Sequence, residues 1–167
     1  MKYPIGIQSF EKIRTEGFVY IDKTAFVYKL ASEGCYYFLS RPRRFGKSLL
    51  ISTMEAYFLG KKDLFEGLAI SKLEKEWHKY PVMHLDLNTE MYNTTEALNN
   101  KLNLALSEWE ELYGSNPNER SLGTRFEGVI RRASEKTGSQ VVILVDEYDK
   151  PLLQAIGNKQ LQDDYRN

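Results

Sequence analysis

Apolar residues recur at helical spacing in four segments of the chain. We therefore predict helices over residues 25–32, 47–59, 95–113 and 122–136. We assign the ends of three of these helices to Gly34, Gly60 and Gly138, because glycine commonly ends a helix. A further short helix is expected at 73–78.

Short apolar runs between these helices predict three strands, over residues 35–39, 82–87 and 141–145. The last run is continuous and rich in β-branched residues, which is typical of a strand buried on both faces of a parallel sheet. Strands that alternate with helices predict an α/β fold with three layers and a mostly parallel sheet.

Composition narrows the class of protein. The 167 residues are 42% hydrophobic and 28% charged, which is typical of a globular domain rather than a disordered chain. The net charge of zero argues against a strong basic field for nucleic acid. The sequence has no signal peptide and no apolar run near the roughly 20 residues that span a bilayer, so we expect a soluble cytoplasmic protein. The single cysteine, Cys35, excludes an internal disulfide, and we expect it to be buried.

A basic loop between the strand at 35–39 and the helix at 47–59 ends in Gly46-Lys47-Ser48. This is the second half of the phosphate-loop pattern G-x-x-x-x-G-K-[ST], with Arg41 in place of the first glycine. Gly46 lets phosphate approach the backbone, Lys47 can reach the β- and γ-phosphates, and Ser48 can bind Mg²⁺. The strand, loop and helix order is the context that such a loop requires.

Residues around this tripeptide complete the predicted ATP site. The backbone N–H groups at the start of the helix would point at the phosphates, and two arginines add cationic donors. The predicted nucleotide contacts are Arg43, Arg44, Phe45, Gly46, Lys47, Ser48 and Leu49. The alternative is an exposed basic turn before a helix, which the order of the elements disfavours.

Two acids, Asp146 and Glu147, follow the strand at 141–145. Ligands bind at the carboxyl edge of open α/β sheets, so this position suits catalysis. We predict that Asp146 and Ser48 hold Mg²⁺, and that Glu147 orients the attacking water while Lys47 acts on the phosphates. The alternative is a strand that simply enters solvent at two charged residues, but the two motifs support each other.

Three stretches of the sequence resemble the AAA-ATPase-like proteins of bacteria. They read Phe18-Val19-Tyr20-Ile21-Asp22-Lys23-Thr24, Ser40-Arg41-Pro42-Arg43-Arg44-Phe45-Gly46-Lys47-Ser48-Leu49 and Val145-Asp146-Glu147-Tyr148-Asp149-Lys150-Pro151. The phosphate loop of that family also reads Arg-Pro-Arg-Arg-Phe-Gly-Lys-Ser, so Arg41 is a family trait. The resemblance implies a P-loop NTPase core with a strand added between the two motif strands, and a catalytic glutamate.

Full-length members carry a sensor strand and a helical region, and many end in a domain similar to restriction-type nucleases. This chain ends at Asn167, before any such part. We therefore expect an N-terminal portion, with a lead-in at 1–34, a nucleotide-binding core at 35–167 and an incomplete C-terminus. An arginine finger would come from a partner subunit, from self-association or from a missing domain.

The leading hypothesis is Mg²⁺-dependent ATP binding with slow hydrolysis. One alternative is a non-catalytic module that binds nucleotide to hold a shape for a partner. Another is a fragment that contacts nucleic acid only with the help of missing domains, suggested by Arg41, Arg43, Arg44, Arg131 and Arg132. The last two residues more often mark a solvated helix face.

Other residues have weaker signals. Those at 20–24 could line an adenine pocket, but by themselves Asp22 and Thr24 favour a helix cap. His84 and Asp86 alternate along one strand, where a structural histidine is the commoner case. Trp77 and Trp109 are expected in the core or in an interface.

Overall fold

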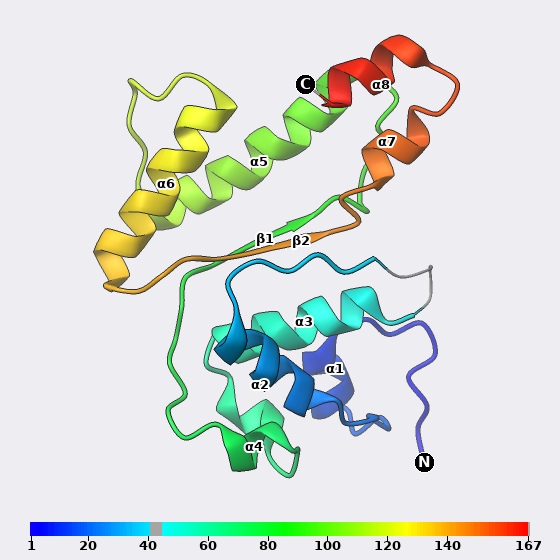
Figure 1. The fold of residues 1–167 in the computed structure, drawn as a ribbon, viewed down its shortest axis with the longest axis vertical. Helices are drawn as coiled ribbons and strands as arrows, with labels where there is room; N and C mark the ends of the chain where they lie inside the picture. The colour runs from blue at the N-terminus through cyan, green and yellow to red at the C-terminus, as the bar shows by residue number, and fades with distance from the viewer. Residues whose placement is uncertain (41–44, 167) are drawn as a thin grey trace. The chain divides into compact units, whose positions relative to one another are not determined.

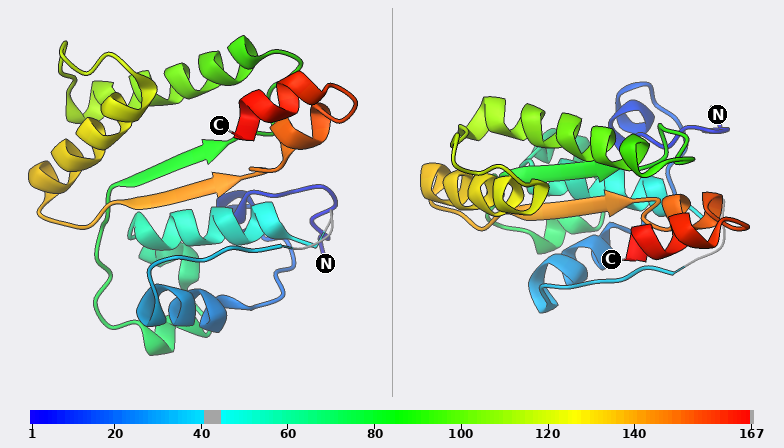
Figure 2. Two further views of the ribbon diagram at one scale, coloured as in Figure 1. Left: turned by 45° about the horizontal axis from the view of Figure 1, so that its top comes forward. Right: turned by 90° about the horizontal axis from the view of Figure 1, so that it is seen from above.

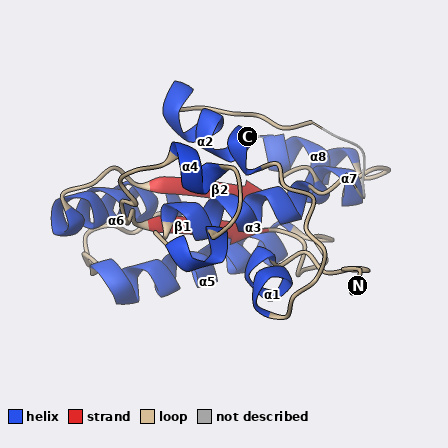
Figure 3. Cartoon of the chain, turned by 90° about the horizontal axis from the view of Figure 1, so that it is seen from below, coloured by secondary structure: helices blue, strands red, loops and turns tan. Residues whose placement is uncertain are grey.

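The computed structural model describes residues 1–40 and 45–166 and is built mainly of helices (Figures 1 and 3). The chain divides into two compact units, Met1–Val82 and Met83–Asn167. Each is described by itself. Among the described helices, none has the length and apolar character needed to cross a membrane.

The regular elements of unit one are helices, apart from Val82, the first residue of a strand, and loops or extended segments join them. Its elements are α1 (Phe10–Thr15), α2 (Thr24–Glu33), α3 (Lys47–Phe58), a 3-10 turn η1 (Lys62–Phe65) and α4 (Ile70–Leu73). The core contains the fully buried Phe10, Phe65 and Ile70, with Phe10 and Phe65 ring to ring at 4.8 Å. The helices predicted at 25–32 and 47–59 are confirmed as α2 and α3.

Asp22 and Thr24 join α2 to α4. One Asp22 oxygen accepts hydrogen bonds from the backbone N–H and the hydroxyl of Thr24, at 2.8 and 2.7 Å. The other accepts the Ala69 N–H at 2.7 Å, and the buried Thr24 hydroxyl accepts the Ile70 N–H at 3.1 Å. The pair therefore has a structural role at the start of α2, although neither residue is its N-cap, which is Lys23 and has no side-chain cap bond.

Three predictions in unit one are wrong. Residues 35–39 form no strand, because an apolar run becomes a strand only where it joins a sheet, and the sheet of the described residues contains other segments. Tyr36 is 97% exposed there, and Cys35 is exposed rather than buried. The helix expected at 73–78 is also absent, because Glu74 takes an extended conformation and its carboxylate accepts the Glu76 N–H.

Unit two combines a small sheet with helices. Strand β1 (Val82–Asp86) starts at the last residue of unit one and pairs with β2 (Val142–Asp146), and both point the same way in Figure 2. The helices are α5 (Thr95–Tyr113), α6 (Leu122–Thr137), α7 (Lys150–Gln154) and α8 (Lys159–Arg166). These elements confirm the helices predicted at 95–113 and 122–136, the strands at 82–87 and 141–145, and an α/β fold with a parallel sheet.

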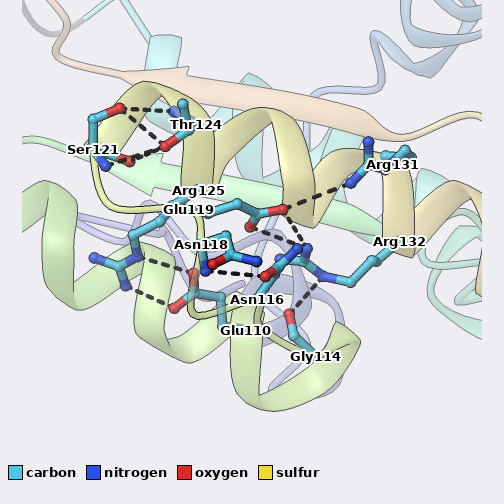
Figure 4. A network of polar contacts seen from close by, with 10 residues as sticks. All are labelled: Glu110, Gly114, Asn116, Asn118, Glu119, Ser121, Thr124, Arg125, Arg131 and Arg132. Atoms are coloured by element: carbon cyan, nitrogen blue, oxygen red, sulfur yellow. Dashed lines mark hydrogen bonds and ion pairs between the residues drawn. The ribbon is translucent and has the colours of Figure 1, made fainter.

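Partly buried ion pairs join α6 to α5 and to the loop between them (Figure 4). Arg125 binds both carboxylate oxygens of Glu110, at 2.9 and 2.7 Å. Arg132 binds Glu119 at 2.8 Å, and the Glu119 carboxylate lies where a Cβ on Gly128 would stand. Arg132 is therefore committed to a structural network and is not part of a solvated face, whereas Arg131 is largely exposed.

The sheet of unit two is covered unevenly. Helices α5 and α6 pack on Met83 and Leu85 of β1. On β2, Ile143 is 43% and Val145 is 38% exposed, at the rim of an apolar pocket of about 340 Å³. Burial of this strand on both faces was predicted and is wrong in this structure, because the described helices cover mainly its neighbour. The three-layer P-loop core remains a prediction.

Candidate nucleotide-binding site

The predicted phosphate loop opens helix α3 directly. Gly46 is the residue before the helix, and Lys47 and Ser48 are its first two residues. Gly46 has φ +75° and ψ 24°, a left-handed conformation that glycine adopts without strain. A Cβ built on Gly46 would meet no atom of the described residues within 4 Å.

The start of α3 is suited to an anion. The first N–H groups of a helix have no acceptor within the helix, and among the described residues no side chain caps this end. The partial positive charge of the helix dipole adds to the ammonium of Lys47, which is half-buried, as is Ser48. Phosphate oxygens are a natural partner for this set of donors.

The body of α3 is held firmly in unit one, which fixes the position of its first turn. Thr53 is buried and donates its hydroxyl to the Leu49 carbonyl at 2.7 Å. Ser52 accepts the Phe10 N–H at 2.9 Å. Phe45 is exposed beside the loop. The predicted contacts Arg43 and Arg44 lie outside the described residues, as does Arg41.

The acidic strand end lies in unit two. Asp146 is the last residue of β2, is only 6% exposed, and accepts the Glu147 N–H at 2.9 Å through Oδ1. Its carbonyl accepts the Leu87 N–H at 3.1 Å, which ties it to the end of β1. Glu147 has φ +53° and is the one non-glycine residue with a positive φ in the described part of the chain. Such strain, of about 1–3 kcal/mol, is concentrated at functional sites.

Long-range hydrogen bonds from α7 and α8 to the loop after β1 support this strand end. We call these bonds the clasp, and the sequence did not predict them. Lys150 donates its ammonium to the Asn88 carbonyl, and Gln154 accepts the Tyr92 N–H at 2.7 Å. The Tyr165 hydroxyl donates to the Tyr92 carbonyl at 3.1 Å. These bonds join residues more than 60 positions apart, so no local sequence pattern predicts them. They fix the polypeptide on both sides of the acidic edge.

The other candidates have structural roles. Asp86 accepts the Asn88 N–H at 2.7 Å and so shapes the turn after β1. Tyr20 packs edge-on against Phe10 at 5.1 Å, and burial raises its pKa. Asp149 precedes α7 and fits the predicted turn. The predicted site residues thus form two clusters, Gly46–Leu49 in unit one and Asp146–Glu147 in unit two.

Comparison with known proteins decides the family. A family model described as "Predicted AAA-ATPase" matches residues 4–167, nearly the whole chain. The chain belongs to this AAA-ATPase-like family. Membership supports an ATPase-like function that includes nucleotide binding.

A relative of this AAA-ATPase-like chain comes from Azotobacter chroococcum mcd 1 and is named "Uncharacterized protein in vnfD 5'region". The two are 38% identical over 167 residues, which cover 99% of this chain and 32% of the relative. The AAA-ATPase-like chain therefore spans about a third of the length of that protein. No solved structure matches this AAA-ATPase-like chain.

Proposed function

We propose that the chain binds ATP with Mg²⁺ and hydrolyses it slowly. The observation that carries the proposal is the opening of α3, where a left-handed Gly46 is followed at once by Lys47 and Ser48. This arrangement brings together the glycine backbone, the N–H groups of the first helical turn and the ammonium of Lys47. The nucleotide-binding core would span residues 35–167, with Arg43, Arg44, Phe45 and Leu49 as further contacts.

The residues fit Mg²⁺ bound together with phosphate. Magnesium prefers oxygen ligands, keeps several waters and needs only one or two protein groups when phosphates are present. The Ser48 hydroxyl and the Asp146 carboxylate would be those groups. The described residues contain no cluster of three or more metal-binding side chains.

Hydrolysis would use Glu147 and Lys47. Glu147 would orient a water whose oxygen attacks the γ-phosphorus, while Lys47 and Mg²⁺ balance the charge on the phosphate oxygens and ADP leaves. The left-handed backbone of Glu147 supports a functional role. An arginine supplied by a partner subunit or by a longer chain would add about 10³- to 10⁵-fold in rate, so the chain alone should be slow.

Thermal unfolding with ATP, GTP and ADP, with and without Mg²⁺, tests binding. A nucleotide at about 100 times its dissociation constant stabilises the folded state by about 2.7 kcal/mol. Lys47→Ala should abolish this gain, and Lys62→Ala, on the exposed turn η1, is the matched control. An equal response of the two variants would exclude the proposed site.

ATP hydrolysis needs a separate test, because a variant can bind ATP and still fail to hydrolyse it. Glu147→Gln should keep the Mg·ATP-dependent stabilisation and lose phosphate release. Glu135→Gln, on the exposed face of α6, should keep both. If Glu147→Gln leaves the rate unchanged, the residue is not catalytic. If the parent chain binds ATP but releases no phosphate, the non-catalytic module becomes the better description.

A further inference from the structure

Unit one contains a pocket of about 280 Å³ that the proposed ATP site does not use. It is lined by three tyrosines, Tyr28, Tyr57 and Tyr80, and by the carboxylates Glu74 and Glu76. Tyr57 lies in the last turn of α3, ten residues from Lys47 or about 15 Å along the helix axis. The pocket and the phosphate loop are therefore at opposite ends of the same helix.

The tyrosine rings are held in place by other aromatic residues. Tyr57 meets Trp77 edge-on at 5.6 Å and Phe58 at 5.1 Å. Phe58 in turn contacts Tyr80 at 5.7 Å, again edge-on. Because these contacts order the rings before any ligand arrives, binding would cost little conformational entropy.

One carboxylate is bonded directly to the aromatic wall. The Tyr57 hydroxyl donates to Glu74 Oε2, and the Glu76 N–H donates to Glu74 Oε1 at 2.9 Å. Burial and the bond to Glu74 raise the pKa of Tyr57, so its hydroxyl stays protonated. Burial opposes ionisation of Glu74, but the bonds from Tyr57 and the backbone outweigh it and lower its pKa. The pocket thus holds a fixed negative charge beside electron-rich rings.

The remaining charges do not cancel this character. Lys75 also lines the pocket, with its ammonium bonded to the Lys72 carbonyl at 3.0 Å, and its single positive charge is outnumbered by the two carboxylates. His78 lies 3.2 Å from Glu76 through Nε2 and is largely exposed, as is Glu76. The acidic excess disfavours an anion here. Aromatic faces with a nearby carboxylate are the usual surroundings of a bound organic cation.

We propose that this pocket binds a small organic cation, with its ammonium or guanidinium group against the tyrosine rings and Glu74 as the counter-charge. The cation could be a free amine or the side chain of a basic residue in a peptide, since both present the same group. The proposal is independent of ATP binding.

Fluorescence of Trp77 provides the assay. Trp77 and Trp109 are the only tryptophans, so the Trp109→Phe chain reports the pocket alone. The probes are propylammonium and tetramethylammonium chloride, with NaCl and sodium propionate as controls at equal ionic strength. We expect saturable binding of both cations and none of propionate. An N-acetyl-lysine methylamide arm distinguishes the sources, since tighter binding than propylammonium points to a peptide side chain.

Two variants, one that removes a negative charge from the pocket and one that removes a positive charge, test the proposal further. Glu74→Gln should weaken cation binding about tenfold, and Tyr28→Leu about fivefold through loss of one ring. Lys75→Gln should strengthen it about twofold, because a like charge is removed. Glu16→Gln, exposed on the same unit, should change nothing. A response to the cations that equals NaCl overturns the proposal. If Glu74→Gln unfolds, Lys75→Gln decides, and no gain in affinity there overturns it as well.

Discussion

The conformation of Gly46 allows backbone strain to be separated from loss of phosphate binding. Gly46→Ala would place a side chain at φ +75°, a conformation that costs an L-residue about 1–2 kcal/mol. Gly67 has the same φ of +75° in the same unit, and at neither position does an added Cβ meet an atom within 4 Å. The two variants should therefore lose similar stability, and neither should suffer a clash.

Their effects on nucleotide should differ. The Cβ at Gly46 would enter the space beside the first N–H groups of α3, where we place the phosphates. We expect at least about a tenfold loss of ATP affinity, which is about 1.4 kcal/mol. ATP at about 100 times the original dissociation constant would then stabilise Gly46→Ala by only about half of the 2.7 kcal/mol given to the parent. Gly67→Ala should keep the full gain.

The assay is thermal unfolding of the Trp109→Phe chain, followed by Trp77 in unit one, with and without Mg·ATP. For a unit of this size, a loss of 1 kcal/mol lowers the midpoint by about 4–8 °C. Equal loss of ATP stabilisation in Gly46→Ala and Gly67→Ala would refute the phosphate site. An unchanged midpoint of Gly46→Ala without ATP would refute the left-handed geometry.

Three further predictions concern stability. Asp22→Ala should lower the free energy of unfolding of unit one by about 2 kcal/mol, because the buried Thr24 hydroxyl and the Ala69 N–H lose their acceptor; urea unfolding followed by Trp77 measures this. Gly128→Ala should destabilise unit two, although alanine normally favours a helix, because its Cβ would displace the Glu119 carboxylate; stabilisation in urea would contradict the network. Glu110 has a lowered pKa, caused first by the hydrogen bond from Arg125, with burial opposing. Its contribution is therefore present above the unfolded pKa of about 4.3 and is lost as the pH falls through the folded value. Glu110→Gln should remove that acid-dependent loss, measured by urea unfolding followed by Trp109 at neutral and acid pH.

Local signals were sufficient for the long helices, though not for the short ones, since the helix predicted at 73–78 is absent. The segments at 47–59, 95–113 and 122–136 have apolar residues at helical spacing, and all three are helices in the structure. The capping box of Ser121 and Thr124 is equally local. Helical hydrogen bonds join residues four apart, so the information that forms them lies within a few turns of sequence.

The sequence by itself also determined the family and the chemistry to look for, because Gly46-Lys47-Ser48 and Asp146-Glu147 are contiguous motifs. Tertiary structure alone decided that residues 35–39 form no strand and that Glu147 has a left-handed backbone. It also decided that Asp22 binds Ala69, 47 positions away. The physical reason is that strand pairing, the hydrogen bonds of the clasp and the strained backbone of Glu147 all depend on contacts between residues far apart in the sequence. No local sequence pattern contains this information.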